Sequence, residues 1–188
     1  MTISEQISAL EKEIEAKKKE LIEARRSLPA VTVEDYELKK PDGSSVRLSE
    51  LFGEYDEMIL IHNMGTGCRH CTLWADGLNS FWPYIKTKSA FVLTSPDPVA
   101  KMAPFVSSRG WNYPVVSTNE STLTADFGMY TEKDGYWPGF TTLKKHADGT
   151  ITRHAQAYFG EGDDYCAIWP MFDLLPSGLG DWEPNYNK

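Results

Sequence analysis

The chain has 188 residues and a formal net charge of −8, with 19 Lys and Arg against 27 Asp and Glu. With 41% hydrophobic and 12% aromatic residues it can bury a core, which excludes a disordered chain. The acidic balance argues against a nucleic-acid partner, because neutralising phosphates needs a basic face. No apolar run reaches about 18 residues and no secretory leader is recognisable, so we expect no membrane partner and a cytoplasmic location.

Residues 3–28 have the apolar periodicity of one long helix, which Pro29 ends. Its 4-3-4 spacing is interrupted only by Lys17, and Glu, Lys and Arg fill the positions between. We expect this stripe to dock on its own domain or on a second copy, with a homodimer through residues 3–28 as the commoner form. A solvated helix that covers one face is the alternative. The apolar positions are Ile3, Ile7, Leu10, Ile14, Leu21, Ala24 and Leu28.

Short apolar runs then alternate with helical segments, which predicts an α/β fold with parallel core strands, flanking helices and an antiparallel edge hairpin. Turns are expected at Asp42-Gly43 and Asp148-Gly149. The expected domains are residues 1–29, a helix for docking or dimerisation; 30–175, the α/β domain; and 176–188, a C-terminal extension. The expected elements are strands at 57–64, 90–95 and 113–118, a helix after Cys68, helices at 97–110 and 163–174, and a hairpin at 139–160.

Cys68 and Cys71 are separated by two residues and lie between an expected buried strand and an expected helix. Exposed amides and the macrodipole at a helix N-terminus favour an anion, so the pKa of the Cys68 thiol is expected to be lowered there. Arg69 and His70 add positive charge between the two sulfurs. Two intervening residues place both sulfurs on one helical turn, where Cys71 can close a disulfide. The pattern therefore favours a redox pair with Cys68 and Cys71 as catalytic residues.

Two other interpretations of the pair stay open. The cysteines could be redox-silent core residues, or they could hold a metal. A metal site needs further ligands, and the sequence has no second C-x-x-C and no H-x3–5-H. We therefore expect no metal and no cofactor. The candidates for further ligands are His62, His70, His146, His154 and Cys166.

Residues 46–143 resemble the thioredoxin-like superfamily, chiefly through "MILIHNMGTGCRHC". The resemblance places His62 where thioredoxins carry a buried Asp that assists the second cysteine, which implies a catalytic proton-transfer role. A core histidine bonded to the backbone is the alternative. His70 resembles the C-x-H-C arrangement of strongly oxidising disulfide oxidoreductases, although Arg69 stands where that family has a Pro. The resemblance therefore adds His62 and His70 to the catalytic candidates.

The same superfamily carries a cis-proline before its edge hairpin, and "YWPGFTTLKK" puts Pro138 at that place. We expect a cis bond at Pro138, with an ordinary trans Pro opening a strand as the alternative. Pro138 and Trp137 are then expected to contact substrate. Trp74, on the helix that follows the cysteines, is expected to line the same cleft, with an ordinary core residue as the alternative.

Several linked motifs, among them "GCRHCTLWADGLN", "SSRGWNYPVVST" and "FDLLPSGLGDW", resemble an uncharacterised bacterial thioredoxin-like family often labelled alkyl hydroperoxide reductase/thiol-specific antioxidant-like. This implies a thiol–disulfide oxidoreductase acting on a protein or small-molecule thiol or disulfide. The peroxidase label fits less well, because the P-x-x-x-T-x-x-C pattern is missing: Gly65 is three positions before Cys68, and Thr66 is two before it. A thiol peroxidase and a non-catalytic interaction module remain the alternatives.

Overall fold

Two parallel strands form the centre of the structure, a computed structural model that describes residues 1–185. Strands β4 (Glu57–His62) and β5 (Ala90–Ser95) pair in parallel, and β6 (Val115–Ser117) continues the parallel sheet beside β5. Every residue of β5 is buried, as expected for a strand covered on both faces. The predicted parallel core is confirmed, with β4 and β6 shorter than expected.

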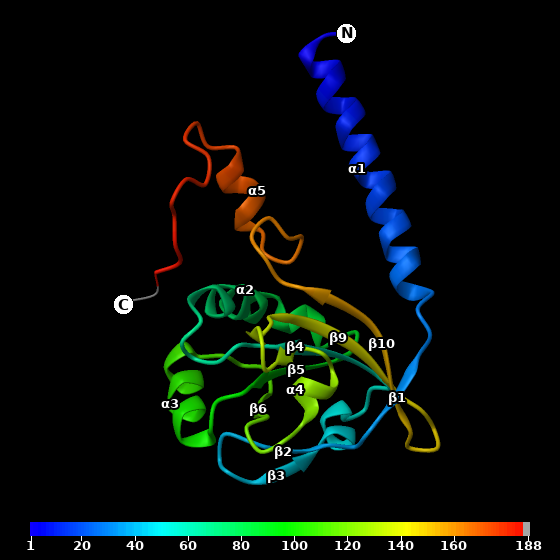
Figure 1. Ribbon diagram of the computed structural model, residues 1–188, viewed down its shortest axis with the longest axis vertical. Helices are drawn as coiled ribbons and strands as arrows, with labels where there is room; N and C mark the ends of the chain where they lie inside the picture. The colour runs from blue at the N-terminus through cyan, green and yellow to red at the C-terminus, as the bar shows by residue number, and fades with distance from the viewer. Residues whose placement is uncertain (186–188) are drawn as a thin grey trace.

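Antiparallel strands extend this core on both sides (Figure 1). Within the described residues, the main sheet has eight strands in the order β1-β10-β9-β4-β5-β6-β2-β3. The hairpin of β9 and β10 is the predicted edge hairpin, and β1 pairs with β10 beyond it. The bounds of the antiparallel strands are Val31–Val33 (β1), Glu37–Lys39 (β2), Ser45–Arg47 (β3), Gly139–Lys145 (β9) and Ile151–Tyr158 (β10).

Helices cover both faces of the sheet (Figure 1). Because successive side chains of a strand point to opposite faces, Leu60 and Ile61 belong to different cores. Ile61 packs with Trp74 under helices α2 (Arg69–Ile85) and α3 (Val99–Arg109). Leu60 packs with Phe127 on the other face. That face is covered by the 3-10 turn η1 (Leu48–Phe52), by helix α4 (Leu123–Asp126) and by the β2–β3 hairpin.

Helix α1 (Ile3–Arg26) stands away from the sheet (Figure 1). It starts with a capping box between Thr2 and Glu5, and it ends two residues before the predicted position. Every residue of α1 is exposed except the half-buried Arg25. Its side-chain bonds to the C-terminal segment run from Lys18 to Asp164, at 2.5 Å, and from Arg25 to the Tyr165 hydroxyl, at 3.3 Å.

The C-terminal segment folds over the first half of α2. Helix α5 (Ile168–Asp173) is shorter than predicted, because the Asp163 carboxylate accepts hydrogen bonds from the backbone amides of Tyr165 and Cys166 and holds a turn there. Trp169 of α5 is 1% exposed and packs edge-on against Trp74. Residues 186–188 of the predicted extension lie outside the described part of the chain. Every described helix is too short or too polar to cross a bilayer.

The chain enters β9 through a short hairpin and a trans proline. Strands β7 (Tyr130–Thr131) and β8 (Gly135–Tyr136) form a separate two-stranded sheet. All peptide bonds of the described residues are trans, so the expected cis bond at Pro138 is wrong. The trans peptide leads directly into the strand, and the Pro138 carbonyl accepts a hydrogen bond from the Phe159 amide at 2.9 Å.

Candidate functional site

The loop between β4 and α2 brings the cysteines to the end of the central strand. Gly65 has a φ of +98°, which L side chains rarely adopt, and its amide donates to the Asn63 side chain at 2.7 Å. The Asp97 carboxylate accepts a hydrogen bond from the Thr66 amide at 2.6 Å. A Cβ at Gly65 would lie 2.7 Å from Asp97 Oδ2. The loop therefore depends on a glycine at 65 and a carboxylate at 97.

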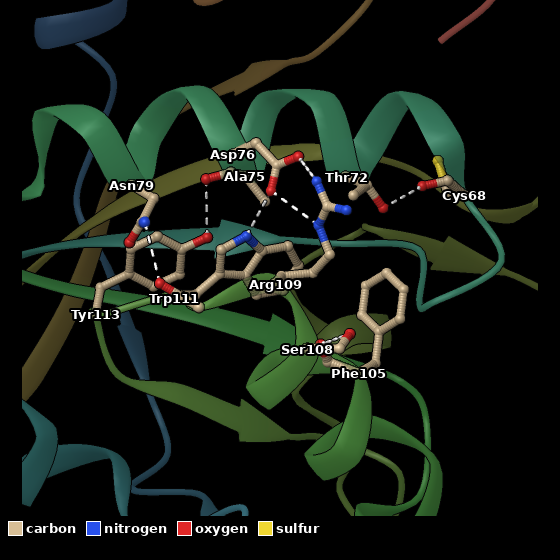
Figure 2. Close-up of polar contacts among 11 residues, drawn as sticks. Cys68, Thr72, Ala75, Asp76, Asn79, Phe105, Ser108, Arg109, Trp111 and Tyr113 are labelled. Atoms are coloured by element: carbon tan, nitrogen blue, oxygen red, sulfur yellow. Dashed lines mark hydrogen bonds and ion pairs between the residues drawn. The ribbon is translucent and has the colours of Figure 1, made fainter. Parts of the chain in front are cut away.

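Cys68 occupies the N-cap position of α2, which confirms its predicted place at the helix start. Its Sγ accepts a hydrogen bond from the Cys71 amide at 3.0 Å. Its carbonyl accepts hydrogen bonds from the amide and the hydroxyl of Thr72, at 3.1 Å and 3.0 Å (Figure 2). The sulfur thus takes the place of the oxygen that caps most helices.

Hydrogen bonds set the acidity of the two thiols in opposite directions. A hydrogen bond with the Cys71 thiol, helped by the amides of Cys71 and His70, lowers the pKa of Cys68 to about 7, although burial opposes this. The hydrogen bond with Cys68, burial and the negative charge of Cys68 raise the pKa of Cys71. Cys68 is half-buried and Cys71 is 3% exposed, and both are free thiols. Cys68 can therefore be a thiolate near neutral pH while Cys71 keeps its proton.

The side chains of Arg69 and His70 were expected to lower the pKa of Cys68 by their positive charge, but they are not among the causes of its low value. Arg69 is exposed. His70 lies beside the C-terminal segment, with its Nε2 3.7 Å from a carboxylate oxygen of Glu183. Its ring centroid is 6.2 Å from that of Trp169. The Cys71 thiol and the backbone amides of the helix start, rather than the flanking cations, favour the thiolate.

An ion pair fixes α2 against the end of α3. Asp76 accepts two hydrogen bonds from the Arg109 guanidinium and one from Trp111 Nε1, the last at 2.9 Å (Figure 2). Two turns separate Asp76 from Cys68, with Thr72 between them on the same face of the helix (Figure 2). Asp76 was not identified from the sequence, because its spacing from Cys68 and Thr72 along the helix is the only local signal it carries. The pair holds the helix that carries both sulfurs.

His62 ends β4 on the face away from α2. Its Nε2 lies 2.8 Å from the Thr141 hydroxyl, and its ring packs edge-on against Phe127. Burial, with the nearby charge of Arg153, lowers the pKa of His62 to about 3, so the ring is neutral at pH 7. Nδ1 is buried with no hydrogen-bond partner within the described residues. These contacts are made with the sheet and with the end of α4. None of them tests the proton-transfer role of His62, which stays a prediction.

Trp74 lies in the core. It is 3% exposed, stacks on Phe159 and donates from Nε1 to Asp163 at 3.4 Å. The C-terminal segment covers it, so this conformation offers none of the indole to a substrate. Its expected role as a cleft residue is thus left without support.

Trp137 and Pro138 lie where the sheet meets the cysteine loop. Gly139, the next residue, pairs with His62 at the end of β4. Trp137 is 45% exposed, and its ring packs edge-on against Tyr158, which is 56% exposed. An exposed aromatic surface therefore borders the loop end of the sheet. Tyr158 was not anticipated, because a single Tyr at the end of a strand carries no local signal.

The described residues contain no group of three or more His, Cys, Asp or Glu side chains placed to hold a metal ion. The third cysteine, Cys166, is buried in the core shared by Trp74 and Trp169. The further ligands that a zinc site at Cys68 and Cys71 would need are thus not assembled in residues 1–185.

Fold and site together define a thioredoxin-fold protein with a C-x-x-C dithiol at the start of α2. The chain belongs to the DUF899 family, described as "Bacterial protein of unknown function", whose model matches residues 3–187. The predicted kinship with the thioredoxin-like, alkyl hydroperoxide reductase-like proteins is confirmed.

Two strains of Mycobacterium tuberculosis have relatives named "Putative peroxiredoxin", each 31% identical over 101 residues. The match spans 52% of this chain and 64% of each relative. Among solved structures, peroxidoxin BcpB of M. tuberculosis is similar, with a TM-score of 0.53 and 26% identity over 67% of this chain and 84% of that one. Peroxiredoxin Q of Xanthomonas campestris has a TM-score of 0.59 and 18% identity over 73% and 89% of the two chains. The similarity to peroxiredoxin Q, at this low identity, is evidence for the fold alone.

Proposed function

We propose that the protein is a thiol–disulfide oxidoreductase that uses Cys68 and Cys71. The observation that carries this proposal is the position of Cys68 Sγ, which caps α2 and accepts the Cys71 amide at 3.0 Å. A thiolate is the nucleophile in disulfide exchange, and a pKa near 7 keeps much of Cys68 in that form at neutral pH. The cytoplasm, where a close cysteine pair is more often catalytic than structural, is the proposed setting.

The exchange takes place in two steps. Cys68 thiolate attacks one sulfur of a substrate disulfide, so that a Cys68–substrate disulfide forms and the other substrate sulfur leaves as a thiolate and takes a proton. Cys71 then loses its proton and attacks Cys68 Sγ, which releases the second substrate thiol and leaves a Cys68–Cys71 disulfide. Two electrons pass from the protein to the substrate, and the reverse sequence oxidises a dithiol. The low pKa of Cys68 favours the reduced dithiol and thus the oxidising direction.

The exposed aromatic surface of Trp137 and Tyr158, beside Pro138, is the proposed substrate contact. Aromatic side chains are enriched where proteins bind partners, because each contributes a large apolar area. A protein or small-molecule thiol with apolar neighbours fits this surface. His70 has a proposed supporting role through the helix start, where its amide helps to lower the pKa of Cys68.

Thiol reactivity against pH tests the proposal. The rate of Cys68 alkylation by iodoacetamide should reach half its maximum near pH 7, and Cys166→Ser should leave this profile unchanged. Cys71→Ser should trap a mixed disulfide with a peptide disulfide. A profile of an ordinary thiol, at about 8.5, with no mixed disulfide, would contradict the proposal and favour the non-catalytic interaction module.

Peroxide reduction is the second candidate, favoured by the relatives named as peroxiredoxins. Cys68 thiolate would attack the terminal oxygen of a peroxide, the O–O bond would break, and the alcohol would leave with a proton. The Cys68 sulfenic acid would then condense with the Cys71 thiol to give the disulfide and water. Peroxide consumption no faster than by a free thiol in stopped-flow measurements would rule this candidate out.

A further inference from the structure

Helix α1 presents an apolar stripe that no part of residues 1–185 covers. We call this stripe the seam. Leu10 is 57% exposed, Ile14 is 53% exposed and Leu21 is 48% exposed. Exposed apolar surface that is continuous in this way marks an interaction site. The seam consists of Ile3, Ile7, Leu10, Ile14, Lys17, Leu21 and Ala24 on α1, together with Leu28 just after the end of the helix.

The spacing of the seam is the same in both directions along the helix. Its steps of four and three residues are those of a heptad repeat, which packs against a second helix. In an antiparallel pair centred between Ile14 and Lys17, Leu10 of one copy lies opposite Leu21 of the other. Ile14 then lies opposite Lys17, whose methylenes can pack on it while the ammonium reaches water. A parallel pair would instead place two Lys17 side chains together.

Charge along α1 favours the same direction. The first half of the helix is acidic: residues 3–15 contain Glu5, Glu11, Glu13 and Glu15 against Lys12. The second half is basic: residues 16–28 contain Lys17, Lys18, Lys19, Arg25 and Arg26 against Glu20 and Glu23. These halves have net charges of −3 and +3 by these counts. An antiparallel pair sets each acidic half beside a basic half, whereas a parallel pair sets like beside like.

We propose that α1 pairs antiparallel with α1 of a second copy of this chain. The bonds of α1 to its own domain involve Lys18 and Arg25, each one position beyond a seam residue. They join the helix to the C-terminal segment and leave the seam uncovered. A helix of 24 residues is about 36 Å long, so the pair separates the two domains by roughly that length.

Directed cross-linking tests both the pair and its direction. In a background with Cys68, Cys71 and Cys166 replaced by Ser, Leu10→Cys and Leu21→Cys variants are prepared separately and oxidised mildly. A mixture of the two should give a covalent dimer. Leu10→Cys alone should not, because in the antiparallel register its two copies lie 11 residues apart, about 16 Å, beyond the reach of a disulfide. A mixture of Lys12→Cys and Lys19→Cys, on the opposite side of the helix, is the control and should give no covalent dimer.

Efficient cross-linking of Leu10→Cys with itself would overturn the antiparallel direction, and no cross-link in any mixture would overturn the pair. The unmodified protein gives a second readout by light scattering, where the mass should be twice the 21.2 kDa of one chain. Ile14→Lys should return it to one chain, because two Lys side chains would then meet in the seam. A single-chain mass for the unmodified protein at about 100 μM would also overturn the proposal. Loss of thiol exchange would not affect either measurement.

Discussion

Asp97 holds the loop that leads to Cys68: its Oδ2 accepts a hydrogen bond from the Thr66 amide at 2.6 Å and lies only 2.7 Å from the place that a Cβ of Gly65 would take. Two hydrogen bonds anchor this carboxylate, the second from Lys101 at 2.6 Å. The Asp97 side chain is 12% exposed, whereas that of Lys101 is 60% exposed. Asp97 is therefore a positioning residue for the dithiol.

Asp97→Ala should slow Cys68 alkylation and move its pH profile upward, because the amide of Thr66 loses its acceptor and the loop loosens around the helix start. The free energy of unfolding should fall by about 1–3 kcal/mol. Denaturant melts and the iodoacetamide profile measure the two effects. Lys101→Ala, which removes only the exposed partner, should change stability by less than about 1 kcal/mol. Equal effects of the two variants would contradict the positioning role.

Cys71→Ala should raise the pKa of Cys68 above about 7, because the thiol that bonds to the Cys68 sulfur is the largest cause of its lowering. Cys71→Ser keeps a donor at the same place and should give a smaller rise. The measurement is thiolate absorbance against pH for both variants. An unchanged pKa in Cys71→Ala would show that the helix start alone sets the acidity.

Acid should destabilise the protein through His62. Its pKa is about 3 in the folded chain, against an ordinary 6.5, so between these values the unfolded chain binds a proton that the folded chain does not. The free energy of unfolding should therefore fall as the pH drops from about 6.5 towards 3, by at most about 1.4 kcal/mol per pH unit from this group. Urea melts of His62→Gln should show a shallower fall. His154→Gln, at an exposed site, should follow the unmodified protein.

Trp137→Ala should raise the KM for a protein disulfide by about tenfold, or about 1.4 kcal/mol, and leave kcat nearly unchanged, because it removes binding area without touching the sulfurs. Exchange with a small disulfide should change little. Tyr84→Ala, on the far end of α2 and 74% exposed, is the matched aromatic control. A fall in kcat with an unchanged KM would contradict the assignment of Trp137 to substrate contact.

The central strands and the helix start at Cys68 could be predicted, because runs of buried apolar residues and a C-x-x-C pair carry local signals. Asp97 and Asp76 could not, since each acts on residues from another element through contacts that the chain makes only after folding. The side of the sheet on which His62 lies was available from the alternation of Met58, Leu60 and His62 along β4, all on the face away from α2. The turn at Asp163 shortened α5, because one carboxylate satisfied several amides outside a helix.

The packing of Trp169 onto Trp74 makes Trp169 and the buried Cys166 part of the hydrophobic interior, so the C-terminal segment that carries them is more than an appendage. A chain cut back to the end of β10 would lose Trp169 and bare the Trp74 indole on α2. Such a fragment should bind hydrophobic dyes and precipitate. A transfer of this dithiol to another scaffold must therefore include the C-terminal segment that covers Trp74.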